Sequence, residues 1–170
     1  MHRLLRYIGR RCLHFDLRKL FIRKVVKMND DRNDAPRGIR NNNPLNIREA
    51  PDGGDRWQGE RKTDDDTSFE EFETVEYGIR AAVIILRKYQ RDYECDTLRK
   101  IINKWAPPVE NNTSSYVDDV AKRMSGIDPD APIDLQKPQT LCSLISAMIW
   151  HENGEQPYSP SVIMDGIRRA

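Results

Sequence analysis

The sequence is most informative about its architecture between residues 139 and 154, where it reads QTLCSLISAMIWHENG. Apolar side chains recur every three or four residues in this stretch, as they do on one face of an α-helix. The apolar stripe consists of Leu141, Leu144, Ile145, Met148 and Ile149. Gly154 follows, and glycine commonly ends a helix because it accepts a left-handed backbone without strain. The pattern therefore predicts a helix over Gln139–Glu152 with one buried face.

Four further helices are expected on similar grounds. Val75–Tyr93 combines apolar residues at near-helical spacing with charges on the opposite side. Capping residues mark three more helix starts. We expect these helices at residues 97–105 after an Asp96 cap, at residues 115–125 after Thr113 or Ser114, and at residues 160–169 after Ser159. The chain is predicted to be mainly α-helical.

The segment before these helices carries signals for turns and short strands. Residues 30–40 are polar and predict a linker, and the run NNNP at 41–44 predicts a turn, because Asn tolerates left-handed backbone and Pro fixes φ. Leu45–Arg48 and Ser68–Phe72 are candidate strands on either side of a loop rich in glycine and aspartate. The expected fold class is therefore mainly α (α+β), with a small irregular β-lobe near the start of the body.

Length, charge and cysteine content exclude several classes of protein. A chain of 170 residues suits one domain with a substantial core. Its longest apolar run, Ala81–Leu86, is far shorter than the roughly 20 residues that a membrane span needs. The three scattered cysteines, Cys12, Cys95 and Cys142, indicate neither a disulfide framework nor a zinc site, and we expect them to be reduced.

The charge is distributed unevenly along the chain. Residues 1–27 hold nine Lys or Arg and one Asp, a balance of +8, so residues 28–170 carry −7 of the net +1. An acidic body argues against nucleic-acid binding, which needs a basic face for phosphate contacts.

Residues 1–27 also carry a pattern of their own. Leu13, Leu17, Phe21 and Val25 recur every four residues between basic side chains, which is typical of an amphipathic helix on a membrane surface or a partner protein. The alternative is a dispensable extension, with Met28 as the working start. We therefore divide the chain into a basic amphipathic extension (1–27) and a main domain (28–170).

The residue types in the body leave carboxylate chemistry as the main candidate for catalysis. The body has one histidine, His151, and its cysteines are 47 residues apart, so no zinc-type ligand set is expected. No nucleophile elbow or nucleotide-binding motif occurs. Glu152 continues the apolar stripe of the 139–152 helix at its last turn, where partial burial and the helix dipole favour a protonated carboxyl. Such an acid can donate a proton to a glycosidic oxygen; the alternative is an ordinary solvated glutamate.

A series of short motifs runs in order from residue 36 to the end of the chain. The motifs are GIRNNNPLNIR at 38–48, WQG at 57–59, YGIRA at 77–81, WAPP at 105–108 and HENG at 151–154, together with Phe69, Phe72, Glu110-Asn111, Thr113, Tyr116 and Pro157-Tyr158. In this combination the chain resembles phage and prophage virion proteins of the lysozyme-like superfamily. Leu45 stands where related sequences often carry glycine, which concerns only the local turn geometry.

Compared with ordinary lytic transglycosylases of that superfamily, the order of the parts resembles a circular permutation. The β-lobe comes first in this chain, and the helix that ends in the catalytic glutamate comes last. The resemblance implies that Glu152 is the catalytic acid and that Tyr116 contacts and orients it. It further implies cleavage of the β-1,4 glycan of bacterial peptidoglycan without a cofactor. The implied setting is a phage particle or infected bacterial cell, with other virion proteins as further candidate partners.

The same resemblance suggests residues that bind the glycan. Asn43, Asn46 and Asn111 can hydrogen-bond saccharide groups, although asparagines in turns also commonly bond their own backbone. Trp57 can stack on the face of a sugar ring.

A second carboxylate would separate two reaction types. Glu73 is the candidate for this role in a hydrolase, with Glu71 and Glu76 as its neighbours. A lytic transglycosylase needs no second carboxylate, because the sugar's own groups can supply that function, so a single strong glutamate favours it. The alternatives are a two-carboxylate muramidase and a non-catalytic phage structural or glycan-binding protein on the same fold.

Overall fold

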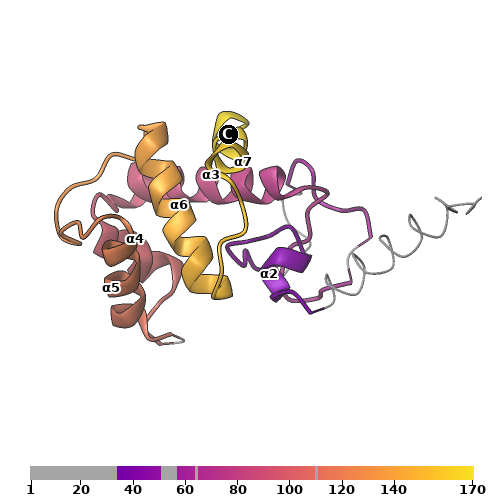
Figure 1. Cartoon of the computed structure of the whole chain (residues 1–170), viewed down its shortest axis with the longest axis horizontal. Coiled ribbons are helices and arrows are strands. Elements are labelled where there is room, and N and C mark those ends of the chain that lie inside the picture. The colour runs from indigo at the N-terminus through magenta and orange to yellow at the C-terminus, as the bar shows by residue number, and fades with distance from the viewer. Residues whose placement is uncertain (1–33, 51–56, 64, 110) are drawn as a thin grey trace, which may run out of the picture. The chain divides into compact units, whose positions relative to one another are not determined.

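The computed structural model describes residues 34–50, 57–63, 65–109 and 111–170, and these form a mainly helical protein (Figure 1). Its helices are α2 (Arg37–Arg40), α3 (Val75–Tyr93), α4 (Leu98–Trp105), α5 (Thr113–Arg123), α6 (Pro138–Asn153) and α7 (Pro160–Arg168). All of them belong to one compact unit, residues 35–170. The basic extension (1–27), with its expected amphipathic helix and Cys12, lies outside the described residues. The prediction of a mainly α-helical protein is confirmed.

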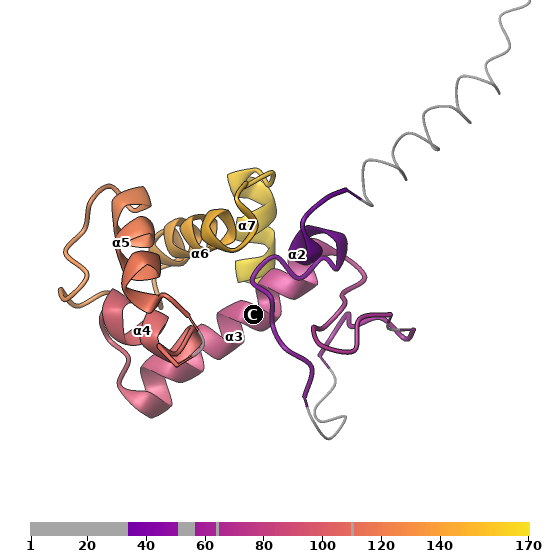
Figure 2. The same cartoon turned by 90° about the horizontal axis from the view of Figure 1, so that it is seen from below.

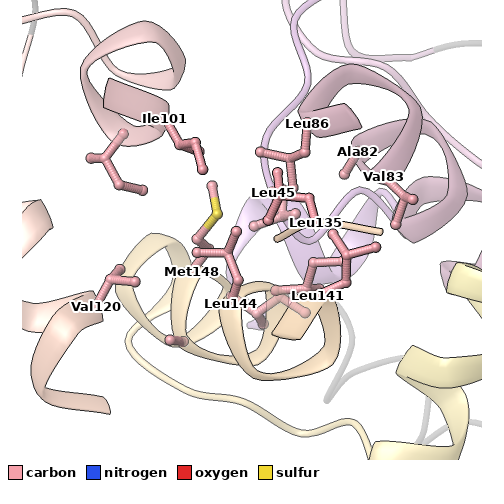
Figure 3. Close-up of a cluster of buried hydrophobic side chains, with 14 of the residues drawn as sticks. Leu45, Ala82, Val83, Leu86, Ile101, Val120, Leu135, Leu141, Leu144 and Met148 are labelled. Atoms are coloured by element: carbon pink, nitrogen blue, oxygen red, sulfur yellow. The ribbon is translucent and has the colours of Figure 1, made fainter. Parts of the chain in front are cut away.

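Helix α6 lies at the centre of the packing, between α5 and α7 in both views (Figures 1 and 2). Its predicted apolar stripe is fully buried, with no exposed area at Leu141, Leu144 or Met148. Figure 3 shows these side chains facing Leu86 of α3 and Leu45, which comes from the asparagine-rich turn. Burial of a leucine side chain stabilises the fold by about 2 kcal/mol. The core therefore fixes the position of α6 and of the residues at its C-terminal end.

Helix α3 has the bounds that its sequence pattern predicts, Val75–Tyr93. Its apolar face is buried at Ile79, Val83 and Leu86, and α7 packs closely across it. A Cβ on Gly166 of α7 would lie 2.5 Å from Cγ2 of Ile79. Glycine at this position therefore allows the two helices to approach each other.

Helix α6 extends one residue beyond its predicted bounds at each end, and two other helices begin at different caps from those predicted. Helix α4 is capped by Thr97, whose hydroxyl accepts from the Lys100 amide, and not by Asp96. The Asp96 carboxylate instead lies 2.8 Å from the Lys100 ammonium group. Helix α5 begins at Thr113 because the Asn112 side chain accepts from the Ser115 amide. Each error reflects neighbouring residues that are all good caps.

The expected β-lobe does not form as strands in the described residues. Only isolated antiparallel bridges occur in this part of the chain, between Arg48 and Phe69 and between Glu60 and Phe72. The Ile47 carbonyl accepts from the Glu70 amide, but the next rung does not form, because the Ile47 N–H and the Glu70 carbonyl both bond to the Asn43 side chain. Such side-chain bonds compete with strand pairing. Residues 37–40 of the predicted linker form the short helix α2. In the described part of the chain, no helix is both long enough and apolar enough to cross a membrane.

Candidate active site

Three distant parts of the chain meet at the carboxyl group of Glu152, in the last turn of α6. The Tyr116 hydroxyl, from α5, donates to Glu152 Oε1 at 2.8 Å. The Asn46 amide donates to Glu152 Oε2 at 2.9 Å. Each carboxyl oxygen thus has one donor, and the two donors fix the plane of the group. The structure brings together Glu152, Tyr116 and Asn46, three of the residues predicted for the site.

The end of α6 is anchored to the asparagine-rich turn by the residue after Glu152. Asn153 Nδ2 donates to the Pro44 carbonyl at 2.8 Å and to the Ile149 carbonyl at 2.9 Å. The first bond ties the turn to the end of the helix, and the second holds the Asn153 side chain against its own last turn. Gly154 then ends α6 in the left-handed conformation, at φ 71°. Glu152 is half-buried, so its carboxyl group lies at the boundary between the core and solvent.

Asn43 has a structural role that differs from the predicted glycan contact. Its side chain is fully buried. Its amide nitrogen donates to the carbonyl groups of Ile47 and Glu70, and its oxygen accepts from the Ile47 amide. The side chain is therefore not available to a ligand, and it holds the turn that presents Asn46. Asn46 itself adopts a left-handed backbone, at φ 51°, which asparagine tolerates better than most residues.

Gly38 allows this turn to approach the end of α6. A Cβ on Gly38 would lie 2.7 Å from Asn153 Oδ1 and 2.8 Å from Asn46 Oδ1. It would also lie 2.9 Å from the backbone oxygen of Asn43. The glycine of the GIRNNNPLNIR motif is thus required by close contact with two side chains around the site.

Tyr116 is the most buried member of the site, with 3% of its surface exposed. Burial, followed by the charge of Glu152 and the hydrogen bond to it, raises the pKa of Tyr116 well above its usual 10.0. The phenol therefore stays protonated and donates throughout the neutral range. The neighbouring His151 bonds to Asp119, at 3.0 Å, and not to Glu152. Its ring stacks on the Tyr116 ring, a contact that the sequence did not predict.

The other two predicted glycan ligands make no polar contact with this cluster. Trp57 is half-buried against the core, and its backbone amide donates to Glu60. Asn111 is exposed in the turn before α5, where its amide donates to the Pro107 carbonyl at 3.3 Å. Both stay predictions as glycan contacts.

The candidate second carboxylates lie apart from the hydrogen-bonded cluster. Glu71 is buried, pairs with Arg61 at 2.7 Å and accepts from the Asp65 amide, so it stabilises the loop. Glu73 is exposed, and Glu76 lies in the first turn of α3. None of the three forms a hydrogen bond with Glu152 or its two donors.

The arrangement around Glu152 suits proton transfer. A partly exposed carboxyl group that is held in one orientation can give a proton to an oxygen bound beside it, and can later take one back. Its two donors are neutral, so neither competes for the role of acid at neutral pH. The described residues contain no group of three His, Cys, Asp or Glu side chains that could hold a metal ion.

Comparison with known proteins gives a relative but no family model. No family model matches the sequence. The chain is 46% identical over 135 residues to Protein P5 of Pseudoalteromonas phage PM2, and the match covers 79% of this chain and 82% of that protein.

Proposed function

Given that the chain belongs to the family of Protein P5 of Pseudoalteromonas phage PM2, we propose that it is a phage enzyme that cleaves bacterial peptidoglycan. The proposed reaction is that of a lytic transglycosylase acting on the β-1,4 glycan. The proposed fold is a lysozyme-like domain whose parts are circularly permuted, and the proposed place of action is the cell wall, from a virion or within an infected cell.

The convergence of Tyr116 and Asn46 on Glu152 supports this proposal most strongly. Asn46 and Tyr116 lie 106 and 36 residues away from Glu152 in the sequence, so only the folded chain can assemble them. A surface glutamate without a function needs no such support, because a solvated carboxylate is already well hydrogen-bonded by water.

A single acid–base group is enough for the proposed reaction. Glu152 protonates the glycosidic oxygen, and the bond between that oxygen and C1 of the muramic sugar breaks. The Glu152 carboxylate then takes the proton of the C6 hydroxyl of the same sugar, whose oxygen closes onto C1. The products are a shortened strand with a free hydroxyl and a 1,6-anhydro-muramic end, and Glu152 is protonated again.

Tyr116 and Asn46 keep the carboxyl group oriented between these two steps. Each donates to a different oxygen, so rotation of Glu152 breaks both hydrogen bonds. Preorganised donors of this kind stabilise charge as it develops on the carboxyl group, without the cost of reorienting solvent.

The alternative is a phage structural or glycan-binding protein without turnover. One observation favours it: both oxygens of Glu152 already accept hydrogen bonds within the protein, as those of a structural carboxylate do. A two-carboxylate muramidase is a further alternative, with the exposed Glu73 as its candidate second group.

Release of soluble fragments from dye-labelled peptidoglycan separates these possibilities. The full chain is compared with Glu152→Gln and with Glu155→Gln, a control at an exposed glutamate three residues further on. We expect Glu152→Gln to lose activity by about a hundredfold or more while it still sediments with peptidoglycan, and Glu155→Gln to match the wild type. A folded wild-type protein that sediments with peptidoglycan but releases no fragments would contradict the enzymatic proposal and support the binding protein.

A further inference from the structure

The Tyr116 ring is held from two sides by consecutive residues of α6. Its hydroxyl donates to Glu152 at 2.8 Å. Its face lies against the imidazole of His151, with ring centroids 3.8 Å apart and planes inclined by 19°. Glu152 and His151 project in directions about 100° apart around the axis of α6, and Tyr116 lies between them and contacts both.

The imidazole is itself held by a carboxylate on α5. Asp119 accepts from His151 Nδ1 at 3.0 Å, and Arg123 donates to both oxygens of Asp119 at 3.0 Å. Partial burial alone would raise the pKa of Asp119, but the hydrogen bonds from Arg123 and His151 lower it below its usual 3.8. The carboxylate therefore stays charged at neutral pH and fixes the imidazole with a proton on Nδ1.

Contact with the ring face controls the direction of the Tyr116 hydroxyl. The phenol oxygen lies on the axis of the Cβ–Cγ bond, so rotation of the ring about that bond leaves the oxygen in place. Only a tilt of the whole ring moves it away from Glu152. An imidazole stacked on the face resists such a tilt, because the ring would have to push against it.

We propose that His151 is a positioning residue for the reaction, which keeps the Tyr116 hydroxyl directed at Glu152. This inference rests on the proposed function of Glu152. Asp119 and Arg123 complete the support by holding the imidazole against the ring. The residue acts through Tyr116, on which its ring stacks, and its own hydrogen bond goes to Asp119 and not to the Glu152 carboxyl group.

A double-mutant cycle with peptidoglycan as substrate tests the proposal. In the full chain, His151→Ala is expected to lower kcat about tenfold with little change in KM. The same substitution in a Tyr116→Phe background is expected to cause no further loss, because the hydroxyl that it positions is gone. His151→Phe, which keeps a ring against Tyr116, is expected to recover most of the rate. Ser143→Ala, at an exposed position of α6, serves as the matched control and should behave as the wild type.

The outcomes separate this inference from the proposed function. Two results with an active wild type would show that the positioning role is wrong while Glu152 remains the acid. One is that His151→Ala keeps its full kcat. The other is that the loss of kcat in the double variant equals the losses caused by His151→Ala and Tyr116→Phe combined. If the folded wild type is inactive, the proposed function fails, and crystal structures of the wild type and His151→Ala decide the inference. We expect the distance between the Tyr116 hydroxyl and Glu152 to exceed 3.5 Å in the variant, beyond hydrogen-bond range. An unchanged distance would overturn the proposal.

Discussion

Replacement of Gly38 by alanine tests how tightly the asparagine-rich turn packs against the end of α6. On helix propensity alone the change should stabilise the short helix α2, since alanine exceeds glycine by about 1 kcal/mol. The atoms packed around Gly38 oppose this stabilisation. The new Cβ would lie within 3.0 Å of Asn153 Oδ1, Asn46 Oδ1 and the Asn43 backbone oxygen, closer than such atoms pack in proteins.

The expected size of the effect follows from what can move. The backbone oxygen of Asn43 belongs to a buried turn and cannot withdraw, and overpacking of this kind costs about 1–3 kcal/mol. The Asn46 and Asn153 side chains can rotate, but each then loses hydrogen bonds worth about 1 kcal/mol. We therefore expect Gly38→Ala to lower the free energy of unfolding by about 2–4 kcal/mol, or the Tm by about 10 °C.

Thermal and urea unfolding of the full chain measure this effect. The control is Gly126→Ala, where φ is +70° but a Cβ would have no neighbour within 4 Å, so backbone strain alone costs about 1–2 kcal/mol. Gly38→Ala should be the less stable variant of the two, and it should also lose the proposed peptidoglycan cleavage because Asn46 is displaced. A Gly38→Ala protein at least as stable as the wild type would show that this close packing is wrong.

Three further substitutions have calculable consequences. Asn43→Ala should lower the free energy of unfolding in urea by about 2–4 kcal/mol because it removes three buried hydrogen bonds, whereas the exposed Asn111→Ala should cost less than about 0.5 kcal/mol; equal losses would contradict the structural role of Asn43. Phe72→Ala should cost about 3–5 kcal/mol in the same assay, since the ring is fully buried, and a loss under about 1 kcal/mol would contradict its burial. The wild type should be more stable than Asp119→Asn above about pH 5, and this advantage should shrink below about pH 4, because the pKa of Asp119 is lower in the folded protein than its usual 3.8. A difference in Tm that grows toward acid pH would contradict the pairing of Asp119 with Arg123 and His151.

The helices were largely predictable because each carries a local signal. The apolar period of α3 and the charges opposite it give its bounds, and Gly154 marks the end of α6 at its left-handed cap. The starts of α4 and α5 were predicted wrongly, because Asp96 and Thr97 are both good caps for α4, and Asn112 precedes three hydroxyl residues at the start of α5. At these two helix starts the local sequence indicates that a capping residue is present, but it does not indicate which of the neighbouring residues is the cap.

The candidate site was predictable only in part. Its place at the end of a buried stripe made Glu152 a candidate, and the family resemblance implied its role and that of Tyr116. The Asn46 contact, in contrast, joins residues 106 positions apart. Asn43 and Asn46 lie in the same turn and have the same side chain, yet one is buried in backbone hydrogen bonds and the other faces Glu152. No local pattern distinguishes them, because the difference depends on how the turn packs against α6.

Mass spectrometry of the fragments released from purified peptidoglycan tests the proposed role of Glu152 most directly. The full-length wild type is predicted to release fragments that end in 1,6-anhydro-muramic acid, and Glu152→Gln, at equal concentration and with the fold verified, is predicted to release none. Fragments with reducing muramic ends would contradict the transglycosylase reaction, and anhydro fragments from Glu152→Gln at the wild-type rate would contradict the role of Glu152 itself.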